Sequence, residues 1–134
     1  MKQIIKKGSF LTLMFMLLGC LSLYAADNDL ITKQFTINLK EDGTLPDRIG
    51  NSRKYRITNL KIIGEINGTD LRMIREMAYG NLSVLDLSEA KIVEGGDCYY
   101  YDCSTSNDVI GSYAFRGCSG LTSLNLPAGI TSIG

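Results

Sequence analysis

IGSYAFRGCSGLTSLNLPAGITSIG, residues 110–134, is the stretch that decides the predicted fold. Its segment LTSLNL, residues 121–126, repeats the LxxLxL pattern of LSVLDL, residues 82–87. The second and third Leu of this pattern are two positions apart, so both point to the same side of a strand. The dipeptide IG also recurs with a spacing of 23 residues, at Ile110 and Ile133. The stretch therefore predicts strands that repeat with this period and bury Leu on a common face.

Further elements can be placed around these two strands. A weaker copy of the pattern lies at residues 57–66, ITNLKIIGEI, and residues 34–40, QFTINLK, alternate apolar and polar side chains as a strand does. Residues 93–108 are interpreted as an insertion between the two LxxLxL strands, a common place for a binding surface.

A helix is predicted directly after the weaker copy of the pattern. Its apolar side chains recur at i, i+3 and i+7, in Leu71, Ile74 and Ala78. Thr69 is expected to cap the start of this helix, and Gly80 is expected to end it.

Together these elements predict an α/β fold, namely a right-handed leucine-rich-repeat solenoid with a parallel sheet on one side and an N-terminal cap. Because the chain stops inside a repeat at Gly134, we expect the array to be truncated at the C-terminus, and catalytic residues beyond that point stay an open alternative. The expected domains are a signal peptide at 1–26, an N-terminal capping segment at 27–56, and leucine-rich repeats at 57–134 with the insertion at about 93–108.

The repeat residues closely resemble the 23-residue repeats of BspA-like leucine-rich repeat proteins, a family of surface or secreted proteins frequent in gut and oral Bacteroidetes. The features that carry the resemblance are Ala114-Phe115, Cys118, LxxLxLP at 121–127 and IxxIG at 130–134. The resemblance covers roughly residues 30–134. It implies a noncatalytic binding role, such as adhesion to host matrix proteins or to another microbe.

The N-terminal segment has the layout of a secretory signal peptide. Lys2, Lys6 and Lys7 form its positive region, and residues 10–24, FLTLMFMLLGCLSLY, form its apolar region. Cleavage is expected after Ala25 or Ala26, and an uncleaved N-terminal anchor is the alternative. The protein is therefore expected to be exported, either secreted or held at the outer cell surface.

Cys20 is a candidate lipidation site, because residues 17–20, LLGC, resemble a bacterial lipobox. The alternative is a cysteine that only forms part of the apolar region, since the sequence after Cys20 stays apolar. Membrane contact is expected only through such a lipid anchor.

Composition excludes several classes of function. Fourteen basic and fourteen acidic residues give no net charge, so nothing indicates nucleic-acid binding. Removing residues 1–26 removes three Lys and no acidic residue, which leaves a charge of 11 − 14 = −3. The chain has no His, which excludes Ser-His-Asp and Cys-His catalysis and HExxH zinc sites in the sequence present. We therefore expect a protein that is not an enzyme, with no cofactor and no metal site.

Tyr99, Tyr100 and Tyr101 in the insertion are the sharpest candidates for ligand binding. Three consecutive Tyr cannot all face a core in an extended segment, and exposed Tyr offers rigid contact area with a hydrogen-bonding tip. The alternative is that one or two of them pack under the loop as a lid. The exposed positions of the predicted strands are further candidates, namely Val84, Asp86, Ser88, Ser123 and Asn125.

Cys98 and Cys103 are candidates for a disulfide, since an exported protein meets an oxidising compartment. Cys118 occupies an apolar repeat position and is expected to be a small core residue.

The charged residues of the predicted helix and of the insertion are interpreted mainly as solvated. Arg72 and Arg75 on the helix leave an anionic-ligand patch as the less favoured alternative. The acidic residues of the insertion lack the DxDxDG pattern of a calcium loop; they are Glu94, Asp97, Asp102 and Asp108.

The sequence thus predicts a noncatalytic leucine-rich-repeat binding protein at the cell surface or outside the cell. Its expected partner is a protein, such as host matrix or a protein of another microbe. The alternative is a glycan-binding or accessory module of a carbohydrate-utilisation system.

Overall fold

The computed structural model describes residues 29–134 of the chain. The predicted signal peptide at 1–26 and the candidate lipidation site Cys20 lie outside the described residues. Within the described part of the chain, no helix is both long enough and apolar enough to cross a membrane.

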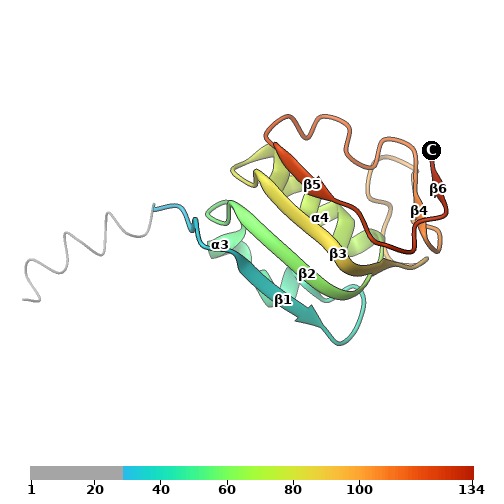
Figure 1. The fold of residues 1–134 in the computed structure, drawn as a ribbon, viewed down its shortest axis with the longest axis horizontal. Coiled ribbons are helices and arrows are strands. Elements are labelled where there is room, and N and C mark those ends of the chain that lie inside the picture. Colours follow the sequence, from blue (N-terminus) through green and yellow to red (C-terminus); the bar gives the residue numbers. More distant parts are fainter. Residues whose placement is uncertain (1–28) are drawn as a thin grey trace, which may run out of the picture.

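A parallel sheet of four strands forms one layer of the domain (Figure 1). Neighbouring strands follow the order β1-β2-β3-β5, and every neighbouring pair runs parallel. Each strand therefore lies beside the next sheet strand along the chain. The strands are β1 (Phe35–Leu39), β2 (Asn59–Ile66), β3 (Val84–Ile92) and β5 (Ser123–Asn125).

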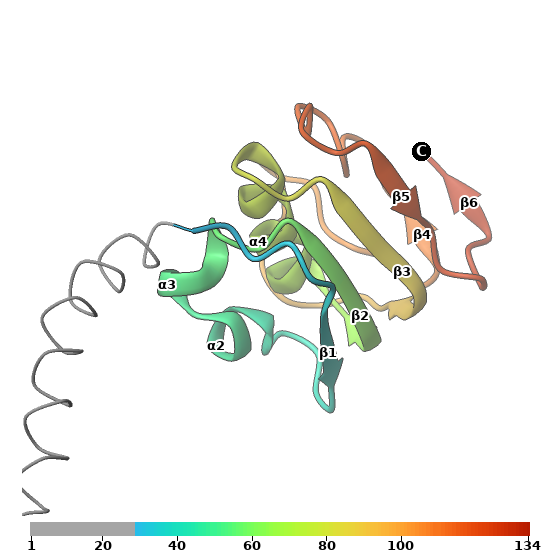
Figure 2. The ribbon, with the colours of Figure 1, turned by 60° about the vertical axis from the view of Figure 1, so that its left-hand side comes forward.

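Three helices cover one face of this sheet, as Figure 2 shows. Two are short, α2 (Leu45–Ile49) and α3 (Asn51–Lys54), and the third is α4 (Gly68–Tyr79). A second, two-stranded parallel sheet joins β4 (Val109–Ile110) to β6 (Ser132–Ile133).

The Leu pattern gave the strand register correctly. Leu60 in β2 is the partner of Leu85 in β3, which is the partner of Leu124 in β5. The spacing of 23 residues is also realised, because Ile110 in β4 pairs with Ile133 in β6. Leu60 and Leu85 are completely buried, so the shared face does form the core.

The predicted leucine-rich-repeat solenoid is wrong, because the chain forms a small α/β domain with one sheet of four parallel strands and three helices. A solenoid needs one supersecondary unit that recurs. Here α2 and α3 connect β1 to β2, α4 connects β2 to β3, and the described connection from β3 to β5 contains no helix. The LxxLxL pattern indicates only that neighbouring parallel strands bury the same face. A solenoid requires this, and so does a sheet that is covered by helices on one side.

The start of α4 differs from the prediction as well. The side chain of Asn67, not that of Thr69, caps the helix by accepting hydrogen bonds from the backbone N–H groups of Thr69 and Asp70. The Asp70 carboxylate in turn accepts the N–H of Asn67 at 2.9 Å, which completes a capping box. Gly80 follows the last residue of α4, as predicted.

The core lies between the sheet and α4. Its largest fully buried side chains come from both layers, and each contributes roughly 1.5–3 kcal/mol relative to an exposed position. Those of the sheet include Leu60, Ile62, Leu85, Leu87 and Ile92, and those of α4 include Ile74 and Met77.

A candidate binding groove along helix α4

A hollow of about 240 Å³ lies where the insertion crosses α4. Its walls combine three consecutive tyrosines of the insertion with side chains of the helix. We call this hollow the tyrosine groove, and its lining residues are Arg72, Arg75, Glu76, Tyr79, Tyr99, Tyr100 and Tyr101.

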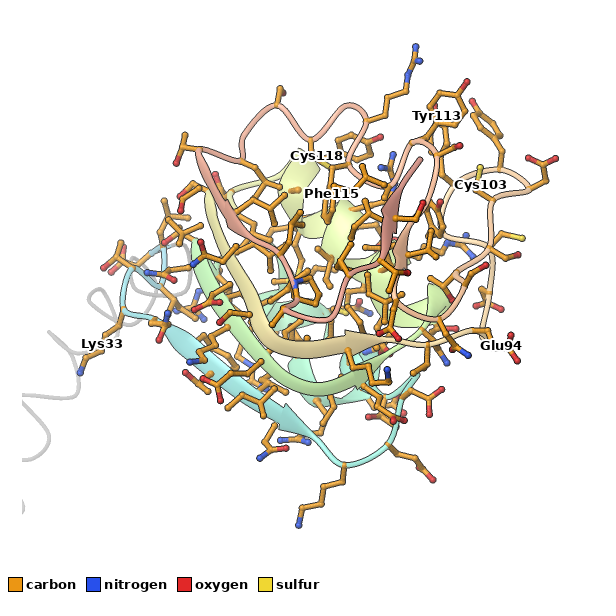
Figure 3. All side chains as sticks on the ribbon, turned by 45° about the vertical axis from the view of Figure 1, so that its right-hand side comes forward. Lys33, Glu94, Cys103, Tyr113, Phe115 and Cys118 are labelled. Carbon is orange, nitrogen blue, oxygen red and sulfur yellow. The ribbon has the colours of Figure 1, made fainter. Side chains whose placement is uncertain are left out.

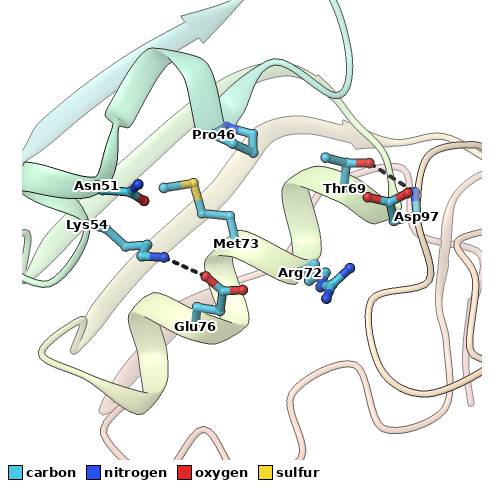
Figure 4. A pocket seen from close by; sticks show the side chains of 8 residues that line it. All are labelled: Pro46, Asn51, Lys54, Thr69, Arg72, Met73, Glu76 and Asp97. Atoms are coloured by element: carbon cyan, nitrogen blue, oxygen red, sulfur yellow. Dashed lines mark hydrogen bonds and ion pairs between the residues drawn. The ribbon is translucent and has the colours of Figure 1, made fainter.

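A second hollow, of about 310 Å³, adjoins the first and is drawn in Figure 4. The two hollows share Arg72 and Glu76, so together they follow the side of α4 that faces away from the sheet. We call the second hollow the methionine pocket, and its lining residues are Pro46, Asn51, Lys54, Thr69, Arg72, Met73, Glu76 and Asp97.

The insertion is fixed against the N-terminus of α4 by backbone contacts. Gly68 donates its N–H to the carbonyl oxygen of Gly95 at 3.0 Å, and Asp97 donates its N–H to the Thr69 hydroxyl at 2.9 Å (Figure 4). A side chain at position 68 would overlap the carbonyl oxygen of Asp97, so only glycine permits this approach. These contacts set the height of the insertion above the helix.

The three consecutive tyrosines have three different environments. Tyr99 is buried and donates its hydroxyl to the carbonyl oxygen of Ser112 at 2.7 Å, and this burial raises its pKa. Tyr100 is half-buried, whereas 84% of Tyr101 is exposed. Tyr99 therefore anchors the loop, as the lid alternative proposed, and Tyr101 offers its ring to solvent.

A tight turn presents Tyr101 at the rim of the groove. Cys103 donates its N–H to the carbonyl oxygen of Tyr100 at 2.8 Å, and Tyr99 donates its N–H to the carbonyl oxygen of Cys103 at 2.9 Å. Tyr101 lies at the tip with a φ of +50°, a region that non-glycine residues rarely adopt. The ring of Tyr101 meets that of Tyr100 edge-on, with 4.5 Å between centroids.

Arg75 organises the floor of the tyrosine groove. Only 3% of this residue is exposed, and its guanidinium lies 4.4 Å from the ring centroid of Tyr100 and 5.5 Å from that of Tyr79. It donates to the carbonyl oxygens of Tyr113 and Ala114, both at 2.9 Å, and to the Tyr79 hydroxyl at 2.7 Å. One buried cation thus joins the helix, the insertion and the segment after β4.

Tyr79 and Tyr113 extend the aromatic surface beyond the three predicted tyrosines. They are 58% and 51% exposed, and the Tyr113 ring centroid lies 5.7 Å from that of Tyr100. Figure 3 shows Tyr113 on the same side of the domain as Cys103, with Lys33 on the opposite side. Sequence reasoning missed both tyrosines, and the signal that could have found Tyr79 is its i, i+4 spacing from Arg75.

The predicted strand candidates lie together on the uncovered face of the sheet. Val84 pairs with Ser123, and Asp86 pairs with Asn125, so the four form two adjacent rows. Hydrogen bonds from Ser88 lower the pKa of Asp86. This face is a second surface that a partner could contact, separate from the groove on the helix side.

The described cysteines are free thiols in the structure. Cys98 is exposed, with its sulfur 3.6 Å from the Ser104 hydroxyl oxygen, and Cys103 is half-buried. The Cys98–Cys103 disulfide stays a prediction, which the mass added by alkylating the unreduced chain would decide. Cys118 is buried, and burial raises the pKa of its thiol, which favours the unreactive protonated form.

The acidic residues of the insertion are spread along it. Asp108 accepts two hydrogen bonds from the Lys91 ammonium, at 2.9 and 3.0 Å, and Glu94 and Asp97 are exposed. Among residues 29–134 there is no group of three or more His, Cys, Asp or Glu that could hold a metal ion.

Comparison with known proteins gives no family for this chain. No protein-family model and no curated protein sequence matches it.

Proposed function

We propose that this chain is an exported, noncatalytic binding protein that recognises another protein, in adhesion or a related contact. The observation that carries the proposal is the exposed ring of Tyr101 at the rim of the tyrosine groove. Export is supported by the signal-peptide pattern of residues 1–26.

The composition of the groove supports a protein partner. Tyr and Arg are enriched among the residues that dominate the binding energy of protein interfaces. Here Tyr79, Tyr101 and Tyr113 are each more than half exposed, and Arg75 fixes the ring of Tyr100 between them. A tyrosine surface of this kind is already ordered before binding, which lowers the entropy lost on association.

A glycan-binding module is the second candidate function. It is favoured by the same ring of Tyr101, because an exposed aromatic face beside charged and polar groups can also receive a sugar. The two candidate functions differ in the ligand, so binding assays on immobilised matrix proteins and on a glycan array distinguish them.

Tyr101→Ala is expected to abolish most of the binding without unfolding the domain. The protein is tested on immobilised collagen, fibronectin and laminin and on a glycan array. Wild type should bind at least one matrix protein, and the variant should bind it about tenfold or more weakly, as expected for an interface tyrosine. Tyr55→Ala is the matched control, because Tyr55 is 49% exposed and lies outside the groove lining.

Equal binding by wild type and Tyr101→Ala would show that the groove is not the contact surface. Binding to glycans alone, weakened by the same substitution, would replace the first candidate function with the second.

A further inference from the structure

The groove carries positive charge that the described residues do not neutralise. Arg72 and Arg75 both line it, and neither forms an ion pair with a carboxylate within residues 29–134. Arg72 is exposed at the junction of the two hollows, and Arg75 is buried beneath the tyrosines. The charge of a buried guanidinium is screened less by salt than that of an exposed one.

The acidic residue shared by the two hollows does not cancel these charges. Glu76 pairs with Lys54 at 2.8 Å (Figure 4), and this hydrogen bond raises the pKa of Lys54. Glu76 is thus already matched by a cation that lies outside the tyrosine groove. The two arginines remain as the excess charge of the tyrosine groove, and Asp97, which lines the adjoining methionine pocket with Arg72, offsets one of them when the two hollows are counted together.

The methionine pocket adds an apolar patch, formed by Pro46 and Met73, among polar and charged side chains that include Asp97. Met73 is 5% exposed, and Pro46 lies across from it, as Figure 4 shows. A ligand that reaches both hollows must pass Arg72. A ligand that fits both hollows therefore carries an acidic group that reaches Arg72 and, a short distance along the same chain, an apolar group that enters the methionine pocket.

We propose that the groove binds an extended acidic segment of a partner protein, in which carboxylates alternate with apolar side chains. A carboxylate contacts the Arg72 guanidinium, within the field of the buried Arg75 charge. An aliphatic side chain enters the methionine pocket, and neighbouring side chains pack against Tyr101. This inference rests on the proposed function and names the kind of partner that the groove accepts.

The test uses two fluorescent peptides of about 12 residues, one alternating Glu with Leu and one alternating Gln with Leu, measured by fluorescence anisotropy. The Glu peptide should bind about tenfold more tightly than the Gln peptide at about 50 mM salt, and this difference should shrink at about 500 mM salt. Arg72→Gln should remove most of the difference. Arg72 is exposed and forms no ion pair with a described residue, so the variant is expected to fold.

Lys33→Gln is the control, because it removes one positive charge from an exposed position on the opposite side of the domain (Figure 3). Equal affinity for the two peptides, no binding of either up to about 1 mM, or an unchanged preference in Arg72→Gln would overturn the inference. If Tyr101→Ala still weakens binding to a matrix protein in that case, the proposed function stands and only the acidic segment is rejected.

Discussion

Asp70→Ala is expected to lower the free energy of unfolding by about 3–5 kcal/mol. Asp70 is completely buried, and its carboxylate accepts three backbone N–H groups: Gly43 at 2.6 Å, Leu45 at 2.9 Å and Asn67 at 2.9 Å. Alanine would leave all three donors without this acceptor, and those of Leu45 and Asn67 are buried away from water. The same change would loosen the chain before α2 from α4.

Urea denaturation followed by circular dichroism measures this effect. Asp47→Ala is the control, because Asp47 is an exposed acidic residue in the first turn of α2, and its loss should cost only a few tenths of a kcal/mol. Asp70→Asn retains one acceptor oxygen and should fall between wild type and Asp70→Ala. Similar midpoints for Asp70→Ala and Asp47→Ala would refute the role assigned to the Asp70 carboxylate.

Arg75→Met is expected to destabilise the domain by about 2–4 kcal/mol and to weaken ligand binding together with it. The substitution keeps much of the buried aliphatic volume. It removes the donors to the Tyr113 and Ala114 carbonyls and to the Tyr79 hydroxyl. It also removes the cation stacked on Tyr100. The loss is smaller than for Asp70→Ala, because methionine fills most of the space of the arginine side chain, whereas alanine leaves a cavity at position 70.

Arg72→Met is the matched control for stability alone, since it changes the same residue type on the same helix at an exposed position, while Arg72 itself lines the groove. Its stability should lie within about 0.5 kcal/mol of wild type. The chain has no Trp, so its fluorescence comes from its seven tyrosines, among them Tyr79 and Tyr100, whose rings contact the Arg75 guanidinium. A spectrum and a urea midpoint that do not change in Arg75→Met would show that Arg75 does not organise the groove.

Local structure could be read from the sequence where spacing fixes it. The Leu spacing gave the register of Leu60, Leu85 and Leu124, because a one-residue slip would turn every Leu away from the core. The helix was also found from spacing, because its apolar side chains recur at i, i+3 and i+7. The Asn67 cap was missed, although Asn67 with Asp70 three residues later is a variant of the capping-box pattern.

The architecture could not be read in the same way. The Leu pattern describes how neighbouring strands pack, and it does not specify the connections between them. One connection contains α4, whereas the next, residues 93–122, contains no helix. A regular repeat of strands was therefore taken for a regular repeat of whole units.

The candidate site could be predicted only in part. Tyr101 was found because three consecutive tyrosines cannot all be buried, but which of them is exposed depends on the turn closed by Cys103. Tyr79 and Tyr113 come from separate segments and lie on one surface because Arg75 contacts both. No local pattern marks such a meeting of distant segments.

The central claim is that the groove along α4 is the binding surface. The most direct test of this claim is amide hydrogen exchange. It compares the protein alone with the protein bound to the matrix protein that it recognises in the binding assay. We predict slower exchange in residues 72–79 and 97–103 on binding, with little change in residues 84–88 and 123–125. Protection confined to the uncovered sheet face, at Val84, Asp86, Ser123 and Asn125, would contradict the account.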